Sequence, residues 1–262
     1  MIKYLIALLA LMLSGALHAE ESIETIALDD GNTMSFVKNF RSDKPQCVLI
    51  LLIGGAGALK IHKRDDGSFA YHNGNFLMRA REELISDGDM MTIAPDTPSD
   101  QADGYSDSFR ETPRHLSDMR RLITYARQRY PAAKVFIVGT SRGTISSGIL
   151  AVKLGDAVSG FIHTSTMSGY VRGAALPLWH LDYSLAKAPQ LFVHHRDDHC
   201  KFTRFSDIKD KAEKFHIPFI DISGGPGDGD NNPCEAFSNH GFLGVEDIAV
   251  MKIKEWIRQV PP

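Results

Sequence analysis

The chain has 262 residues, a length typical of one substantial α/β domain and short for two. With 43% hydrophobic and 23% charged residues and a formal net charge of −3, its composition is that of an ordinary globular protein. It carries neither the basic excess that indicates a nucleic-acid partner nor the acidic tail that indicates a solvated linker.

Residues 1–19 have the pattern of a secretory signal peptide. A lysine precedes an apolar run at 4–13, and small residues then lead to Ala19. The run is well short of the ~20 apolar residues that a membrane-spanning helix needs. We therefore expect cleavage after Ala19, with Ala16 as the alternative site. We also expect a single domain over 20–262 and a secreted or periplasmic protein with no membrane contact after cleavage.

Continuous apolar runs alternate with helical patterns along the rest of the chain, which is typical of a mostly parallel sheet with helices on both faces. Strands are predicted at 22–28 and 33–38, as an initial hairpin, and then at 47–53, 90–94, 134–138, 158–163, 190–195 and 217–222. Helices are predicted at 75–87, 114–129, 142–154, 205–215 and 245–259.

Two long polar segments, 54–74 and 96–112, follow the first two of the predicted parallel strands. Loops of such length without structure of their own are commonly functional, and in open α/β sheets ligands bind beyond the strand C-termini. Between 164 and 189 there is room for a small excursion, but a large lid domain would not fit.

The strand at 134–138 runs into Gly139-Thr140-Ser141-Arg142-Gly143, followed by a helical pattern. This is the G-x-S-x-G nucleophile elbow, in which a strained serine at a strand-to-helix turn holds its hydroxyl clear of the sheet. The flanking glycines remove the Cβ atoms that would clash there. The sequence predicts Ser141 as a nucleophile and the backbone N–H of Arg142 as an oxyanion-hole donor.

A nucleophilic serine needs a histidine base and a carboxylate that orients it. Asp198 lies just beyond the strand at 190–195 and is the preferred acid, with Asp197 as the alternative. His240 lies beside a glycine in the loop before the last helix, which suits a base. The order serine, acid, histidine supports this assignment.

The second oxyanion donor is expected from Gly54-Gly55-Ala56-Gly57, where glycines let the backbone approach a ligand. The same cluster could be a phosphate loop, but no Lys-Ser/Thr follows at the required offset and no G-x-G-x-x-G spacing is present.

The chain contains three cysteines. Cys47 begins an apolar run and is interpreted as a buried strand residue. Cys200 and Cys234 lie in polar loops, and export permits a disulfide, so we expect these two to pair.

These features resemble a poorly characterised group of secreted bacterial serine hydrolases of the α/β-hydrolase superfamily, over nearly all of the mature sequence. The resemblance extends to Asn75-Phe76-Leu77 with Arg79, to Asp96-Thr97-Pro98-Ser99-Asp100, and to His240-Gly241-Phe242 with Glu246. It implies an α/β-hydrolase fold and serine-hydrolase chemistry on Ser141, Asp198 and His240. Together with the short segment at 164–189, this predicts an α/β-hydrolase fold without a large lid domain.

One departure from that group lies in the segment 54–57 that is expected to supply the second donor, here called the oxyanion loop. Many relatives have His-Gly where this chain has Gly54-Gly55. The second donor therefore stays open between Gly55 and Ala56. A bridge between Cys200 and Cys234 would tie the loop of the predicted acid to the loop of the predicted base.

The function expected is a carboxylesterase-type hydrolase that acts through an acyl-enzyme on a small or medium ester, with no cofactor or metal. Amidase or peptidase activity would use the same residues. Arg110 and Arg142 lie near the predicted pocket and either favour an acidic or phosphate-bearing substrate or serve as surface or ion-paired arginines.

Two other classes of function compete with this one. A metal-dependent hydrolase would use the cluster His194, His195, Asp197, Asp198 and His199, although adjacent strand residues point to opposite faces. A binding module would keep the hydrolase scaffold without its chemistry. The sequence leaves the oligomeric state open.

Overall fold

The computed structural model describes residues 18–169, 181–229 and 232–261. The predicted signal peptide lies almost wholly outside the described residues and stays a prediction. Within the described part of the chain, none of the helices combines the length and apolar character needed to cross a bilayer.

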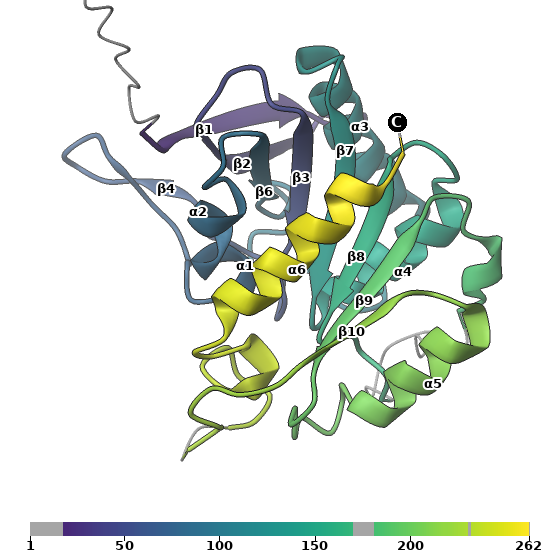
Figure 1. The fold of residues 1–262 in the computed structure, drawn as a ribbon. Helices are drawn as coiled ribbons and strands as arrows, with labels where there is room; N and C mark the ends of the chain where they lie inside the picture. Colours follow the sequence, from purple (N-terminus) through teal and green to yellow (C-terminus); the bar gives the residue numbers. More distant parts are fainter. Residues whose placement is uncertain (1–17, 170–180, 230–231, 262) are drawn as a thin grey trace, which may run out of the picture.

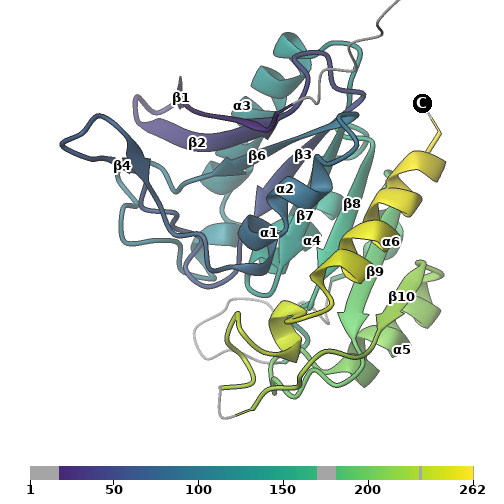
Figure 2. The ribbon, with the colours of Figure 1, turned by 60° about the vertical axis from the view of Figure 1, so that its left-hand side comes forward.

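One eight-stranded sheet forms the centre of the molecule, in the order β1-β2-β6-β3-β7-β8-β9-β10 (Figures 1 and 2). Its strands are β1 Glu20–Ala27, β2 Thr33–Phe40, β3 Cys47–Leu52, β6 Met90–Pro95, β7 Lys134–Thr140, β8 Gly160–Thr164, β9 Gln190–His195 and β10 Phe219–Ile222. The first hairpin pairs antiparallel with β6, and all later neighbours are parallel. The mostly parallel sheet predicted from the apolar runs is confirmed.

Helices cover both faces of this sheet (Figure 1). Their bounds are α1 Phe76–Arg79, α2 Arg81–Leu84, α3 Pro113–Arg129, α4 Gly143–Lys153, α5 Phe205–Phe215 and α6 Glu246–Gln259. One hydrophobic cluster packs α1, α2 and α6 against one face, and others pack α3, α4 and α5 against the opposite face. Because β3, β6, β7, β8 and β9 lie between these layers, every one of their residues except Lys134 is buried.

The structure refines three sequence predictions. The helix predicted at 75–87 is two single turns separated at Ala80, and the second ends before Gly88, whose φ of +77° turns the chain. The predicted loop at 54–74 contains a small hairpin, β4 His62–Lys63 with β5 Phe69–Ala70, which turns at Asp66-Gly67. The predicted loop at 96–112 contains a 3₁₀ turn, η1 Phe109–Glu111.

The carboxyl ends of the parallel strands meet along one edge of the sheet, which gathers the segments that follow β3, β7 and β9. The chain between β8 and β9 forms no lid domain in its described portion, which contains only the short turn η3 Tyr183–Leu185. The fold is therefore a lidless α/β-hydrolase fold.

Candidate active site

Ser141 occupies a sharp turn between β7 and α4. Its φ of +50° is a left-handed conformation that non-glycine residues rarely adopt. The turn is held by its backbone N–H, which donates to Thr164 O at 3.1 Å, and by its carbonyl, which accepts from Thr144 N at 2.8 Å. A Cβ atom at Gly143 would lie 2.1 Å from Leu52 O, so α4 can approach β3 only through a glycine.

Asp198 lies in the turn after β9, buried, with hydrogen-bond donors around its carboxylate. Oδ1 accepts from Cys200 N at 2.9 Å, and Oδ2 accepts from Thr203 Oγ1 at 2.9 Å. His194 Nε2, 3.3 Å from the same Oδ2, approaches from the end of β9. Burial by itself raises the pKa of this carboxyl, but hydrogen bonds from His194 and His240 outweigh burial and hold the pKa well below its usual range. Asp198 is therefore an anion at neutral pH.

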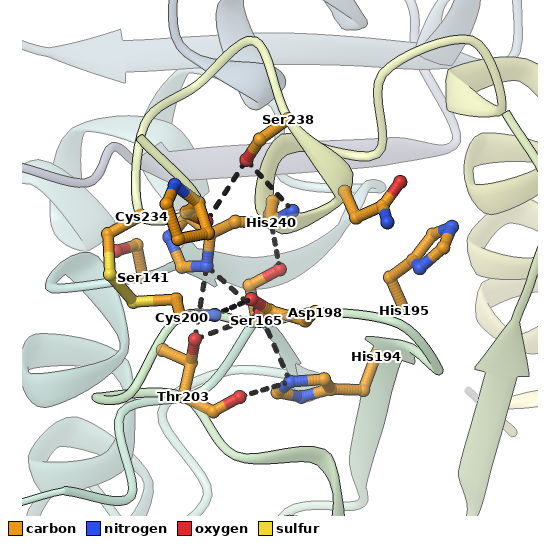
Figure 3. Close-up of polar contacts among 12 residues, drawn as sticks. Ser141, Ser165, His194, His195, Asp198, Cys200, Thr203, Cys234, Ser238 and His240 are labelled. Atoms are coloured by element: carbon orange, nitrogen blue, oxygen red, sulfur yellow. Dashed lines mark hydrogen bonds and ion pairs between the residues drawn. A yellow bond between two sulfur atoms is a disulfide. The ribbon is translucent and has the colours of Figure 1, made fainter. Parts of the chain in front are cut away.

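His240 lies in the turn η4 Asn239–Gly241 and contacts the acid directly (Figure 3). Its Nδ1 lies 3.0 Å from Asp198 Oδ2 and 3.1 Å from Thr203 Oγ1. The carboxylate accepts the Nδ1 proton, which leaves Nε2 as the free lone pair of the ring. Ser165 Oγ donates to the carbonyl of His240 at 2.7 Å and ties this turn to the end of β8.

The alternative acid, Asp197, is exposed, and Nδ1 of His240 contacts Asp198 instead. Its backbone carbonyl accepts a 2.9 Å hydrogen bond from Asn239 Nδ2, so it fastens the histidine turn through the main chain.

Ser141 and His240 line one cavity of about 590 Å³, and Figure 3 shows the serine beside the imidazole ring. No hydrogen bond joins the two side chains among the described residues. In enzymes without bound substrate, hydrogen bonds between catalytic groups are commonly long and tighten on binding. The structure thus brings all three predicted residues to one site.

The glycine-rich loop after β3 passes directly over the elbow. A Cβ atom at Gly54 would lie 3.0 Å from Ser141 Cβ, so a glycine permits this close approach. Gly55, Ala56 and Arg142 all line the cavity. Asp96 holds the far end of the loop, because its carboxylate accepts from Leu59 N and Ile61 N at 2.8 Å each.

A disulfide joins Cys200 to Cys234, as expected, with an S–S distance of 2.07 Å. It borders the cavity and links the turn of Asp198 to the segment before His240 (Figure 3). Cys47 is the free cysteine, and burial raises the pKa of its thiol to about 11. The one cysteine outside the disulfide, Cys47, thus lies in the core.

Apolar side chains form much of the cavity wall, namely Ile53, Ala58, Phe76, Met167, Phe202 and Ala236. Charged and polar groups stand at its rim, among them Lys60, His72, Asp103 and Glu235. A volume of this size accommodates a small organic molecule.

The two arginines considered as substrate contacts have other partners. Arg142 Nε donates to Asp107 Oδ1 at 2.8 Å, which neutralises its charge. Arg110 is buried, and its guanidinium lies beneath the glycine-rich loop after β3, where it donates to the carbonyl of Gly55.

The histidines of the predicted metal cluster point to separate partners. His194 Nε2 donates to Thr203 O, His195 Nε2 contacts Gly224 O, and exposed His199 contacts Asp228. The metal-like grouping found among the described residues is Asp198, Cys200 and His240, and the sulfur of Cys200 is committed to the disulfide. The side chains at the site therefore do not fit a metal centre built on the cluster His194–His199.

Three residues that support the site were not identified in these roles from the sequence: Thr203, Ser165 and His194. The position of His194, four residues before Asp198, was visible in the sequence. Thr203 and Ser165 carry no motif, because their roles depend on loops that meet only in the fold.

Comparison with known proteins supports the fold. No protein-family model and no curated protein matches the sequence. Among solved structures, a putative dienelactone hydrolase from Klebsiella pneumoniae is similar over 92% of this chain and 99% of its own, with 14% identity and a TM-score of 0.64. A lidless α/β serine hydrolase from Xanthomonas campestris is similar over 89% of this chain and 95% of its own, with 12% identity and a TM-score of 0.57.

A third similar structure is a cold-adapted esterase from an Arctic intertidal metagenomic library, solved with bound zinc. It covers 92% of this chain and 94% of its own, with 12% identity and a TM-score of 0.60. A putative dipeptidyl aminopeptidase IV from Bacteroides ovatus matches over 95% of this chain but 37% of its own, with 12% identity and a TM-score of 0.66. At such low identity these likenesses establish the α/β-hydrolase fold.

Proposed function

We propose that this protein, which has the α/β-hydrolase fold, is a serine hydrolase that cleaves a small or medium carboxylic ester. The observation that carries the proposal is the convergence of Ser141, in a left-handed elbow, with a histidine whose Nδ1 is engaged by a buried aspartate. The sequence motif and the order of these residues along the chain favour the same three residues.

In the proposed reaction Ser141 Oγ attacks the ester carbonyl while His240 Nε2 accepts its proton. Asp198, with its lowered pKa, remains an anion and stabilises the imidazolium that forms. The backbone N–H of Arg142 and one N–H of the loop after β3 hold the developing oxyanion. His240 then returns the proton to the leaving alcohol, and water repeats the sequence on the acyl-enzyme.

The volume and lining of the cavity support a modest substrate. The apolar wall suits a short or medium acyl group, whereas the open, lidless approach differs from a buried lipid channel. The disulfide supports the proposed export to an oxidising compartment.

The first test is labelling with a fluorophosphonate probe, followed by intact-mass measurement and peptide mapping. We expect one adduct, on Ser141, and none in a folded Ser141→Ala variant. A folded wild-type protein that forms no adduct would sink the serine-hydrolase proposal and favour a binding module.

The second test is hydrolysis of p-nitrophenyl esters from acetate to laurate, beside matched p-nitroanilides. We expect the highest kcat/KM for short or medium esters and little turnover of anilides. Faster cleavage of the anilides would instead assign an amidase or peptidase. Treatment with a chelator should leave the rates of hydrolysis unchanged. Loss of the protein's activity after this treatment would point to a metal-dependent hydrolase.

A further inference from the structure

Arg110 is a buried cation with no carboxylate partner among the described residues. It is 2% exposed. Its two terminal nitrogens donate to Gly55 O at 3.0 Å and to Ser146 Oγ at 3.1 Å, and its guanidinium lies 5.1 Å from the ring centre of Tyr105. Burial of a guanidinium without an opposite charge beside it costs free energy of folding. A functional role would explain why the arginine lies at this position.

The oxyanion loop is fixed through its carbonyl groups. Gly54 O accepts from Gly57 N at 3.2 Å, Ala56 O accepts from Tyr105 N at 2.7 Å, and Gly55 O accepts from Arg110. Gly57 has φ of +76°, and a Cβ there would lie 3.0 Å from the guanidinium nitrogen. The loop is thus shaped to bring Arg110 against its inner side.

The direction of the Gly55 carbonyl determines where the next N–H points. The described residues contain no cis peptide bond, and in a trans peptide the C=O and the following N–H point in opposite directions. Because Gly55 C=O points inward to buried Arg110, Ala56 N–H points away from it, and Ala56 lines the cavity on the outer side. No backbone acceptor among the described residues pairs with this N–H.

We propose that Arg110 is a positioning residue of the oxyanion hole, which orients and polarises the Gly55–Ala56 peptide so that Ala56 N–H is the second donor. This inference rests on the proposed serine-hydrolase function. A cation on the carbonyl oxygen draws electron density from the N–H of the same peptide, and this effect is strong where water is excluded. The polarised N–H then binds the oxyanion more tightly than the neutral ester carbonyl.

The Arg110 guanidinium remains charged despite its burial, and its contacts hold it in place. Burial lowers its pKa to about 10, so it stays protonated at neutral pH. Ser146, on α4, also contacts His115 Nε2 at 2.9 Å, and this links the guanidinium to α3. The Gly55–Ala56 peptide is therefore positioned by η1, α4 and α3 before substrate binds.

The experiment compares Arg110→Met with Arg110→Lys and with Ser146→Ala, which removes the other hydrogen bond of the guanidinium and leaves the Gly55 contact. Readouts are kcat, KM and the inhibition constant of an alkyl trifluoromethyl ketone, which forms an oxyanion on the serine. We expect Arg110→Met to lower kcat about 10- to 100-fold with nearly unchanged KM, and to weaken ketone inhibition by a similar factor. Lysine should restore part of this loss, and Ser146→Ala should change both values less than Arg110→Met.

A folded Arg110→Met protein with wild-type ketone affinity would overturn the inference. Should that variant not fold, amide NMR of the wild-type protein labelled with ¹⁵N-alanine and ¹⁵N-glycine tests whether Ala56 N–H is the second donor, as the inference requires. We expect the ketone to move the Ala56 amide proton downfield, and a shift of Gly55 alone would overturn the inference. Absence of any ketone adduct on Ser141 would instead overturn the proposed function and, with it, this inference.

Discussion

Arg79 and Glu246 form an ion pair of 2.9 Å between α1 and the first turn of α6. The same guanidinium donates to Gly241 O at 2.7 Å and to Ala236 O at 3.0 Å, on either side of His240. The motif that contains Arg79 and the motif that contains His240 and Glu246, both part of the family resemblance, are thus joined in the fold. Arg79 anchors the turn of the proposed base.

Arg79→Met removes these bonds and leaves the carbonyls of the histidine turn without their donor. We expect the free energy of unfolding to fall by about 2–3 kcal/mol, because hydrogen bonds from a charged group are among the stronger ones. We also expect kcat to fall while KM changes little. Urea denaturation and ester kinetics measure these two effects.

The matched control is Arg258→Met, at the other end of α6. Arg258 pairs with Asp87 and Asp89 at the surface, so its loss should cost under about 1 kcal/mol and leave kcat unchanged. Equal losses of stability and activity in the two variants would contradict the anchoring role of Arg79.

Asp198→Asn tests the identity of the acid. The amide cannot stabilise the imidazolium or select the tautomer with the proton on Nδ1, so kcat should fall about 10³- to 10⁴-fold. Asp197→Asn is the control, because that side chain is exposed and Nδ1 of His240 contacts Asp198 instead, and it should retain activity within a few-fold of wild type. Steady-state kinetics on the best ester distinguish the two aspartates, and the reverse ranking would make Asp197 the acid.

Stability should depend on pH through two buried histidines. Burial, with the nearby charge of Arg110, lowers the pKa of His115 from 6.5 to about 3, and burial lowers the pKa of His163 to about 4. The unfolded chain therefore binds protons that the folded chain does not. This contribution to stability is complete above about pH 6.5 and is lost as the pH falls towards the folded pKa values.

His115→Gln should reduce the slope of unfolding free energy against pH, between pH 4 and 6, by at most about 1.4 kcal/mol per pH unit. Urea titrations at a series of pH values measure the slope. Leu116→Ala, which destabilises the same helix without removing an imidazole, should shift the whole curve and leave its slope unchanged. An unchanged slope in His115→Gln would show that this histidine is not neutral in the fold.

Removal of the disulfide should weaken both the fold and the site. Cys200 and Cys234 are 34 residues apart, and a ring of that size corresponds to about 3–4 kcal/mol in a chain-entropy account. We expect reduced wild-type protein, or the variant Cys200→Ala/Cys234→Ala, to unfold at lower urea concentration and to lose kcat. Reductant should have no effect on the double variant, and a reduced enzyme with full kcat would contradict the coupling of the bridge to the acid–base pair.

Much of the fold was predictable, because the parallel strands are buried on both faces and therefore read as unbroken apolar runs. The strand at 47–53 and the helix at 114–129 were located to within one residue of their observed ends. The break at Ala80 could not be predicted from the residue itself, because alanine favours a continuous helix.

The three residues proposed for catalysis were predictable because each follows a recognisable element, and their geometry was not. The hydroxyl of Thr203 reaches Asp198 through a loop whose path depends on the disulfide and on α5. Arg110 was interpreted as a cation near the substrate because its position in a polar loop suggested exposure. Only the fold shows that this loop turns the guanidinium inward beneath Gly55.

The disulfide also encloses α5 and the edge strand β10, which lie between its two cysteines. Proteins open locally in cooperative units that are less stable than the whole fold, and an edge strand with its covering helix can form such a unit. When this edge opens, the chain remains a closed ring, and Asp198 and His240 stay tethered at its neck. Because the disulfide keeps Asp198 and His240 close together, few conformations have to be searched before β10 and α5 pack back onto the sheet. Transient opening of this edge therefore does not separate the acid from the base by a long distance.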